Sequence, residues 1–285
     1  MVSPLKKKSF DLKFPFNKVK RSKSRKKKSD KKSTAWDEVA AWYDALVGDC
    51  GSDYHRKIIM PGVFKLLDLS EKSKVLDLAC GQGVFCRYLS KKGFLVHGVD
   101  VSKELLLYAR SRSGKSIKYT LADAAEQGFL NERYFDAAVC LLALQNIKKM
   151  ESVLRNVSNC LKLGGKFVAV VTHPCFRIPR QTCWGWDEKK RMQYRRIDHY
   201  KTGIKIPIIA PPFSDSSRFT DTYHRSLQEY MEALSKANLW VDAIEEWSSN
   251  KVSEPGKRSR AENRARKEIP LFMAFRARLS SNSKV

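Results

Sequence analysis

Apolar, β-branched segments alternate with helical segments along the middle of this sequence, between residues 74 and 173. The segments that we expect to be strands are 74–79, 94–100, 117–123, 134–144 and 166–173. Most of them are continuously apolar, which is typical of parallel strands that are covered on both faces. The alternation therefore predicts an α/β fold in which helices cover both faces of a mostly parallel sheet.

Helical spacing of apolar residues appears between these strands and on either side of them. Helices are expected at 34–48, 55–67, 83–92, 102–112, 150–165 and 225–239. Thr34 is suited to cap the first helix, because Asp37 follows it at the spacing of a capping box. Pro61 should break or kink the second helix, and two glycines should close the fifth. Two further strands are expected at 240–247 and 269–279, separated by a basic loop.

The domain organisation follows from where the alternation of strands and helices begins and ends. Residues 1–34 are expected to be a disordered basic tail, because dense like charge with few apolar residues cannot form a core. One folded domain should cover 35–279, beginning with a helical cap at 35–70. Residues 174–222 have no sustained period and are expected to form an irregular insertion or lid. Residues 280–285 should be a flexible C-terminus.

The net charge of +25 is unusually high and is concentrated at the N-terminus. Residues 1–34 contain 14 Lys or Arg and only two acidic residues. Such segments attract polyanions and acidic lipids by long-range, salt-sensitive forces. The tail is therefore either a solvated segment without a specific role or an arm that holds RNA, ribosomes or acidic lipid. RNA or ribosome contact is expected at residues 1–34 and in the basic loop at 250–267.

The cysteines indicate a reducing compartment. There are seven, an odd number, and none forms a C-x-x-C pair, so we expect buried, reduced thiols rather than disulfides. Their spacing offers no zinc site, and no metal is expected. No apolar run approaches the ~20 residues that cross a bilayer, and the N-terminus lacks the apolar core of a secretory signal. These features predict a cytoplasmic protein without a transmembrane segment.

A glycine-rich turn follows the first expected strand in "KVLDLACGQGVFCRYL". Gly81 and Gly83 would allow a ligand to approach the backbone closely. Cys86 stands where a dinucleotide fingerprint has its third glycine, and no Lys followed by Ser or Thr completes a P-loop. Asp77, just before the turn, would repel a pyrophosphate but attract an ammonium or sulfonium cation. The turn therefore favours a cationic ligand.

Acidic residues also end the next two expected strands. In an open parallel sheet the carboxyl ends of the strands meet at the ligand-binding edge. Asp100 can accept hydrogen bonds from both hydroxyls of a ribose, and Asp123 can accept one from an exocyclic amine. Together with the acidic turn, these carboxylates fit S-adenosylmethionine, and they disfavour a dinucleotide-dependent oxidoreductase.

Five motifs stand in a familiar order: "VLDLACGQG", "VHGVDVS", "LADAAEQGF", "FDAAVCLLALQNI" and "LKLGGKFVAVVTHPCF". Through them the sequence resembles class I S-adenosylmethionine-dependent methyltransferases, in particular the type 11 (UbiE-like) group. The resemblance covers about residues 36–172 and continues more loosely through 279. It implies a methyltransferase with a Rossmann-like, seven-stranded sheet whose last strand is antiparallel, with the cofactor over the first four strands.

The resemblance also implies which residues hold the cofactor. They are Tyr43, Asp77, Ala79, Gly81, Gly83, Asp100, Val101, Asp123, Ala124, Cys140 and Leu141. Tyr43, Tyr54 and His55 resemble positions at which an N-terminal helix closes over the cofactor, although Tyr43 also suits core packing. We expect Cys140 to be a buried thiol rather than a nucleophile, because no base is paired with it in the sequence.

Methyl transfer depends mainly on orientation of the acceptor and exclusion of water. A general base is needed only where the acceptor carries a proton. His173, at the end of the fifth expected strand, is the first candidate catalytic base. His224 is the second and His55 the third.

The acceptor is open between a small molecule, which is slightly favoured, and RNA. Type 11 relatives mostly act on small molecules, and "CLLALQNI" lacks the Asn/Asp-Pro-Pro-aromatic pattern of methyltransferases that act on adenine or glutamine. In contrast, Trp184 and Trp186 lie among basic residues and can stack nucleobases. The alternative function is a catalytically lapsed, basic protein that binds nucleic acid or ribosomes. The acidic and glycine residues of the expected cofactor site argue against this alternative.

Overall fold

The chain divides into two units, Met1–Lys32 and Ser33–Val285. The computed structural model describes residues 33–128, 130, 132–210 and 218–280. The basic tail, up to residue 32, and the last five residues lie outside the described residues. Among the described residues, no helix has both the length and the apolar surface needed to cross a membrane.

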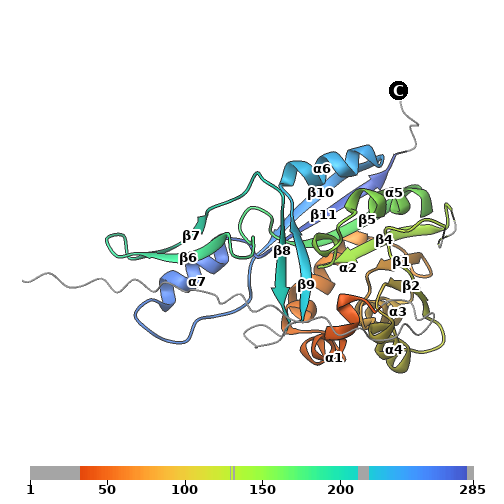
Figure 1. Ribbon diagram of the computed structural model, residues 1–285, viewed down its shortest axis with the longest axis horizontal. Coiled ribbons are helices and arrows are strands. Elements are labelled where there is room, and N and C mark those ends of the chain that lie inside the picture. Colours follow the sequence, from red (N-terminus) through yellow and green to blue (C-terminus); the bar gives the residue numbers. More distant parts are fainter. Residues whose placement is uncertain (1–32, 129, 131, 211–217, 281–285) are drawn as a thin grey trace, which may run out of the picture. The chain divides into compact units, whose positions relative to one another are not determined.

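A seven-stranded sheet forms the centre of the second unit, with the strand order β10-β11-β5-β4-β1-β2-β3 (Figure 1). Its strands are β1 (Lys74–Leu78), β2 (Leu95–Asp100), β3 (Lys118–Leu121), β4 (Phe135–Leu141), β5 (Leu161–Thr172), β10 (Leu239–Trp247) and β11 (Phe272–Leu279). Strands β1 to β5 pair in parallel, whereas β11 is antiparallel to both of its neighbours. The expected mostly parallel sheet with an antiparallel last strand is confirmed.

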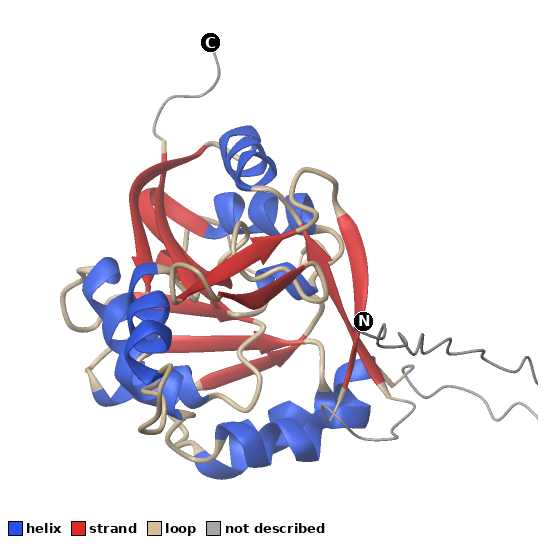
Figure 2. Cartoon of the chain, turned by 90° about the vertical axis from the view of Figure 1, so that its left-hand side faces the viewer, coloured by secondary structure: helices blue, strands red, loops and turns tan. Residues whose placement is uncertain are grey.

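Helices cover both faces of this sheet (Figure 2). One apolar cluster joins the sheet to α5 (Met150–Cys160) and α6 (Leu227–Lys236). A second joins the opposite face to α2 (Met60–Leu67), α3 (Val84–Lys91) and α4 (Lys103–Arg112). The sheet residues are apolar on both faces because both faces are buried, which is the pattern read from the sequence.

The first helix, α1 (Ala35–Val47), begins with the expected capping box at Thr34 and Asp37. It is held against α4 by polar contacts: Ser102 Oγ donates to Asp37 Oδ1 at 2.7 Å, and Arg112 pairs with Asp44. The next segment is a π-helical turn, η1 (His55–Ile59), that runs directly into α2. Pro61 lies in the first turn of α2, where a missing N–H costs little.

Three segments differ from their expected local structure: the end of α5, the insertion and the basic loop. Helix α5 ends at Cys160, and the two glycines near residue 165 lie within β5, where its pairing with β4 shifts register. The insertion forms two antiparallel hairpins, β6–β7 (Thr182–Asp187 and Met192–Ile197) and β8–β9 (Ile204–Ile209 and Phe219–His224). The basic loop contains α7 (Ser259–Glu268), which lies beside the β6–β7 hairpin (Figure 1). A short 3-10 turn, η2 (Leu144–Asn146), follows β4.

A buried lysine joins α2 to the sheet. Lys166 on β5 donates from Nζ to the carbonyl oxygens of Leu67 (2.9 Å) and Asp68 (2.6 Å) at the end of α2. These carbonyls have no partner within the helix, and a cation is favoured at a helix C-terminus. Lys166 thereby fixes the helix that leads into β1.

Replacing Lys166 by Met should lower the free energy of unfolding by about 1–3 kcal/mol, because two carbonyls lose a charged donor. Lys162→Met is the matched control on the same strand: Lys162 pairs with Asp136 on a half-exposed surface, and its loss should cost less than about 1 kcal/mol. Urea unfolding followed by circular dichroism measures both. Equal losses would show that Lys166 does not support α2.

Candidate functional site

A cavity of about 710 Å³ lies at the carboxyl ends of the parallel strands. The segments that follow β1, β2, β3 and β4 form its floor, and α1 and the β8–β9 hairpin contribute the opposite wall. The residues of the floor are Ala79, Gly81, Val99, Asp100, Val101, Ala122, Asp123, Ala124, Leu141 and Leu142. This is the edge at which an open parallel sheet binds its ligands.

The turn after β1 has backbone angles that favour glycine. Ala79, Gly81 and Gly83 all have left-handed φ angles, of 54°, 55° and 76°. A Cβ atom added at Gly83 would lie 2.4 Å from the Tyr119 hydroxyl, and one at Gly81 would lie 3.3 Å from the Tyr43 ring. The turn therefore admits a ligand close to its backbone but has no room for a side chain at Gly83.

Asp100 is fixed by two backbone donors at the end of β2. Its Oδ2 accepts from the Gly81 N–H at 2.7 Å, and its Oδ1 accepts from the Ser102 N–H at 2.8 Å. The residue is 6% exposed, and burial raises the pKa of its carboxyl to about 6. Asp100 lines the cavity, and each oxygen retains a lone pair for a further donor.

Asp77 lies one layer deeper, on β1. It is 2% exposed and accepts from the Cys86 thiol at a Sγ–Oδ2 distance of 3.1 Å. Burial raises the pKa of its carboxyl to about 7, even though the Cys86 contact acts to lower it. Among the described residues, no Lys, Arg or His nitrogen lies within 4.0 Å of the carboxylates of Asp77 or Asp100. The two buried acids therefore have no internal counter-ion.

The other expected cofactor residues divide between the cavity and the core. Val101, Asp123, Ala124 and Leu141 line the cavity, as does Tyr43 from α1. The Asp123 carboxylate is oriented by the N–H of the residue two positions on, at 2.9 Å.

Cys140 does not line the cavity. It lies fully buried below the floor, where burial raises the pKa of its thiol well above the usual range. The thiol is therefore protonated at neutral pH, which fits a packing residue rather than a nucleophile.

The three candidate histidines have different surroundings. His173 is buried, with Nε2 2.6 Å from Glu246 Oε1 and Nδ1 accepting from the Cys175 N–H at 3.2 Å. His224 donates from Nε2 to the Tyr200 carbonyl at 2.6 Å. Neither lines the cavity.

His55, on η1, does line the cavity. Its Nδ1 lies 2.7 Å from the Ser52 hydroxyl, and burial lowers the pKa of the imidazole. The ring is therefore neutral at pH 7, as a general base requires.

The far side of the cavity contains residues that the sequence analysis did not single out. Gln145 is 8% exposed; its Nε2 donates to the Leu142 carbonyl at 2.9 Å, and its Oε1 is buried without a partner among the described residues. If the amide were flipped, Oε1 would face the Leu142 carbonyl oxygen, and neither atom can donate a hydrogen bond. The orientation of the amide is therefore fixed. Thr222 Oγ1 donates to Asn146 Oδ1 at 2.9 Å and ties the β8–β9 hairpin to the cavity. Polar residues directly after the apolar run of β4, in "LQN", were the available signal.

The cavity wall is mostly apolar and aromatic away from the glycine turn. Trp36 and Trp42 from α1, Ile208 from β8 and Leu271 before β11 contribute to it. Lys148 is the one Lys or Arg among the described residues that line it. The cavity itself is therefore unsuited to a ligand with several phosphates.

Comparison with known proteins identifies the same region. Residues 76–169 match the family described as "Methyltransferase domain" (Methyltransf_11). The ubiquinone biosynthesis O-methyltransferase of Thiobacillus denitrificans is 33% identical over 95 residues, which are 32% of this chain and 41% of the relative. YqeM of Bacillus subtilis, named as a methyltransferase, is 34% identical over 146 residues, or 49% of this chain and 56% of YqeM. The chain thus spans about half the length, or less, of these curated relatives.

Solved structures share the fold over a longer part of the chain. An S-adenosylmethionine-dependent methyltransferase from Mesorhizobium loti superposes with a TM-score of 0.60 at 26% identity. The match covers 76% of this chain and 96% of that protein. The seven-stranded sheet therefore has the Rossmann-like fold of these S-adenosylmethionine-dependent methyltransferases.

The two buried carboxyls give stability a specific pH dependence. Their pKa values are higher in the folded chain than the ordinary value of 3.8, so the folded state binds more protons and its free energy of unfolding falls as pH rises through this range. From about pH 5 to pH 8, the free energy of unfolding of the wild type should fall on the order of 2–4 kcal/mol further than that of the double variant Asp77→Asn/Asp100→Asn.

Urea unfolding at both pH values measures this difference. Asp136→Asn is the control. The contact with Lys162 lowers the pKa of the Asp136 carboxyl on β4, so this group is already ionised throughout the pH range of the experiment. If the free energy of unfolding changed with pH in the same way in the wild type and the double variant, burial would not raise the pKa of these two carboxyls.

Proposed function

Because residues 76–169 form a class I methyltransferase domain of the type 11 group, which uses S-adenosylmethionine, we propose that this chain transfers a methyl group to a small molecule bound between α1 and the β8–β9 hairpin. One observation carries the proposal: two buried carboxylates without a counter-ion stand beside a glycine turn that opens into a largely apolar cavity. This arrangement favours a cationic ligand with an aromatic part, since a cation relieves the cost of burying the acids.

The residues of the site fit S-adenosylmethionine. The turn at Ala79, Gly81 and Gly83 would hold its methionine end, where the field of Asp77 and Asp100 favours positive charge. Asp100 would accept from the ribose hydroxyls, and Asp123 from the adenine amino group. When bound, the cofactor supplies an electrophilic methyl group on a sulfonium. The protein then has to orient the acceptor and exclude water, which can contribute roughly 7–11 kcal/mol.

The acceptor that the cavity suits best has an apolar frame and a hydrogen-bond donor. Gln145 Oε1 is a buried acceptor without a partner among the described residues, and leaving it unpaired costs about 1–3 kcal/mol. Gln145 lines the cavity, so a turn of its side chain would bring this oxygen to a hydroxyl or N–H of the substrate. The name of the Thiobacillus denitrificans relative, an O-methyltransferase, supports a hydroxyl.

His55 is the residue best situated to remove the proton of such a hydroxyl. It lines the cavity, burial keeps it neutral, and the Ser52 hydroxyl orients its ring through Nδ1. His173 and His224 have their ring nitrogens bonded outside the cavity, so the order in which the sequence ranked the three histidines is reversed in this proposal.

The second candidate function is binding of RNA or ribosomes by a methyltransferase fold. The net charge of +25 favours contact with a polyanion, and residues 1–34 and 250–267 are the segments proposed for it. The buried acids argue that the cofactor site is retained, because a lapsed site has no reason to keep uncompensated charges. We propose a cytoplasmic location for either function, since all seven cysteines are free thiols.

Asp100→Ala should weaken binding of S-adenosylmethionine by about 1–3 kcal/mol, because hydrogen bonds to a charged acceptor are lost. Asp136→Ala removes a carboxylate of β4 that lies outside the cavity and serves as the control. Calorimetric titration of both variants measures the effect. Unchanged affinity in Asp100→Ala would remove this residue from the cofactor site.

His55→Gln should lower the rate of methyl transfer about 100-fold or more, while cofactor affinity stays within about twofold. The remaining activity should lose its dependence on pH near the pKa of the imidazole. A screen of phenols and other hydroxylated aromatic compounds with labelled methyl groups provides the assay. Full activity in His55→Gln would mean that the acceptor reaches the site already deprotonated or that another group is the base.

A further inference from the structure

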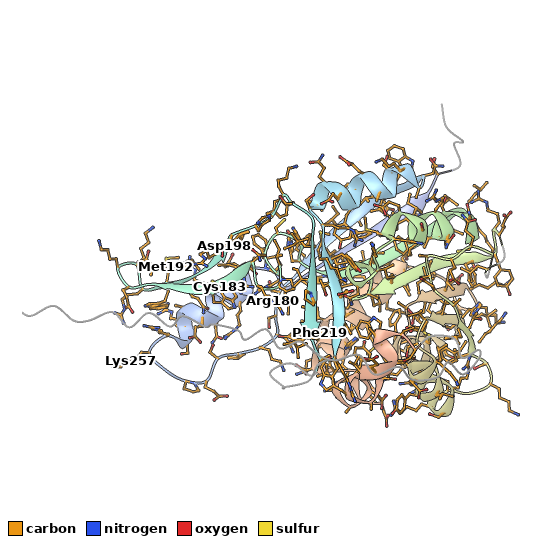
Figure 3. The ribbon with its side chains drawn as sticks, viewed as in Figure 1. Arg180, Cys183, Met192, Asp198, Phe219 and Lys257 are labelled. Atoms are coloured by element: carbon orange, nitrogen blue, oxygen red, sulfur yellow. The ribbon has the colours of Figure 1, made fainter. Side chains whose placement is uncertain are left out.

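Two segments that are far apart in the sequence form one projecting surface. The β6–β7 hairpin, with its flanking residues 174–198, lies beside α7 and the residues 250–258 that lead into it (Figures 1 and 3). Arg258 connects them: its Nη2 lies 2.8 Å from Glu188 Oε1, and its guanidinium lies 4.5 Å from the centre of the Trp186 ring. We name residues 174–198 and 250–268 together the hairpin–helix surface.

Most of the net positive charge outside the tail belongs to this surface. Residues 174–198 and 250–268 contain fourteen Lys or Arg and six Asp or Glu, a net charge of +8. Residues 35–285 as a whole carry +13, from 41 basic and 28 acidic residues. The charge of the folded part is therefore concentrated on one sixth of its residues, which is the pattern of a polyanion-binding surface.

Several of these cations are not neutralised by acids. Arg177 and Arg195 lie 5.0 Å and 5.1 Å from the centre of the Trp184 ring. Among the described residues, their hydrogen bonds go to carbonyl and hydroxyl oxygens, not to carboxylates. Burial and the nearby charge of Arg195 lower the pKa of Arg177 to about 10. Both side chains therefore remain charged at neutral pH and add to the field of the surface.

The outer face of the hairpin presents an aromatic ring. Tyr194 on β7 is opposite Gly185 on β6, and a Cβ at Gly185 would lie 2.3 Å from the ring. The tyrosine therefore lies flat against the strand, and it is 47% exposed. Met192, at the turn end of the hairpin in Figure 3, is on the same face and exposed. The basic turn 189–191 is directly beside them.

We propose that the hairpin–helix surface binds single-stranded RNA, with a base stacked on Tyr194 and the adjacent phosphates on the basic turn 189–191, while the charge of α7 on the other face of the hairpin adds to the long-range attraction. Proteins bind single-stranded nucleic acids through exposed aromatic rings flanked by Lys and Arg. An unstacked base is available in RNA loops and ends but not within a duplex. This inference makes specific the RNA contact proposed above for residues 250–267.

The surface is separate from the candidate active site. None of the described residues in 174–198 or 250–268 lines the cavity. RNA binding and methyl transfer can therefore be tested independently: loss of one in a variant does not require loss of the other.

The first test compares two triple variants of the full chain with equal changes in charge. Lys189→Glu/Lys190→Glu/Arg191→Glu alters the turn of the hairpin. Lys91→Glu/Lys103→Glu/Lys115→Glu alters exposed lysines on and near α3 and α4. Fluorescence anisotropy with a labelled, unstructured RNA of 15 nucleotides should show affinity about tenfold weaker for the hairpin variant, with a salt slope smaller by about 2. The control variant should change affinity less than about threefold.

The second test isolates the aromatic ring. Tyr194→Ala should weaken RNA binding about fivefold or more at an unchanged salt slope, and Tyr194→Phe should bind as the wild type does, because stacking does not need the hydroxyl. Tyr134→Ala, at another exposed tyrosine, is the control. Thermal unfolding and titration with S-adenosylhomocysteine verify that each variant is folded with an intact cofactor site.

Three results would overturn the proposal. Equal losses in the two triple variants would mean that RNA responds only to total charge. Wild-type affinity in Tyr194→Ala would remove the stacked base. Tighter binding to duplex DNA, or to vesicles containing acidic lipid, than to the RNA would assign the surface to another partner.

Discussion

Two carboxylates buried at the carboxyl edge of the sheet, with no balancing cation among the described residues, are the constraint on which the site depends. Asp77 and Asp100 are desolvated, and burial raises the pKa of both. Proteins rarely bury acids without partners, because the cost is several kcal/mol per charge. The glycine turn and the backbone donors to Asp100 hold these acids beside a cavity that a cationic ligand can enter. Under the proposed function, a bound cation would offset the unfavourable burial of these two carboxyls.

The segments added to the common sheet have different roles in this arrangement. The β8–β9 hairpin is tied to η2 through Thr222 and Asn146 and forms part of the cavity wall opposite the glycine turn. The β6–β7 hairpin and α7 pack on each other through Trp186 and Arg258, outside the cavity. One half of the insertion therefore lines the cavity, while the other half presents charge to the solvent.

Local patterns were sufficient to predict the sheet and its edge, because strands covered on both faces are apolar throughout and the acids stand at strand ends. They were insufficient for the insertion. The strands "TCWGWD" and "MQYRRI" have no continuous apolar run, because their hairpin packs against α7, a partner that comes about 70 positions later in the sequence. Glycines near 165 suggested a helix end, yet they form an irregularity within β5. Gln145 and the surroundings of the three histidines depend on tertiary contacts that no spacing in the sequence reveals.

The most direct measurement is calorimetric titration with S-adenosylmethionine near pH 6.5 in two buffers of different ionisation enthalpy, with NAD as a control ligand. A bound cation should lower the pKa values of Asp77 and Asp100, so binding should release protons. S-adenosylhomocysteine, which lacks the sulfonium charge, should release fewer protons, and NAD should not bind. Binding of S-adenosylmethionine without proton release, or no binding at all, would contradict the role given to the two carboxylates.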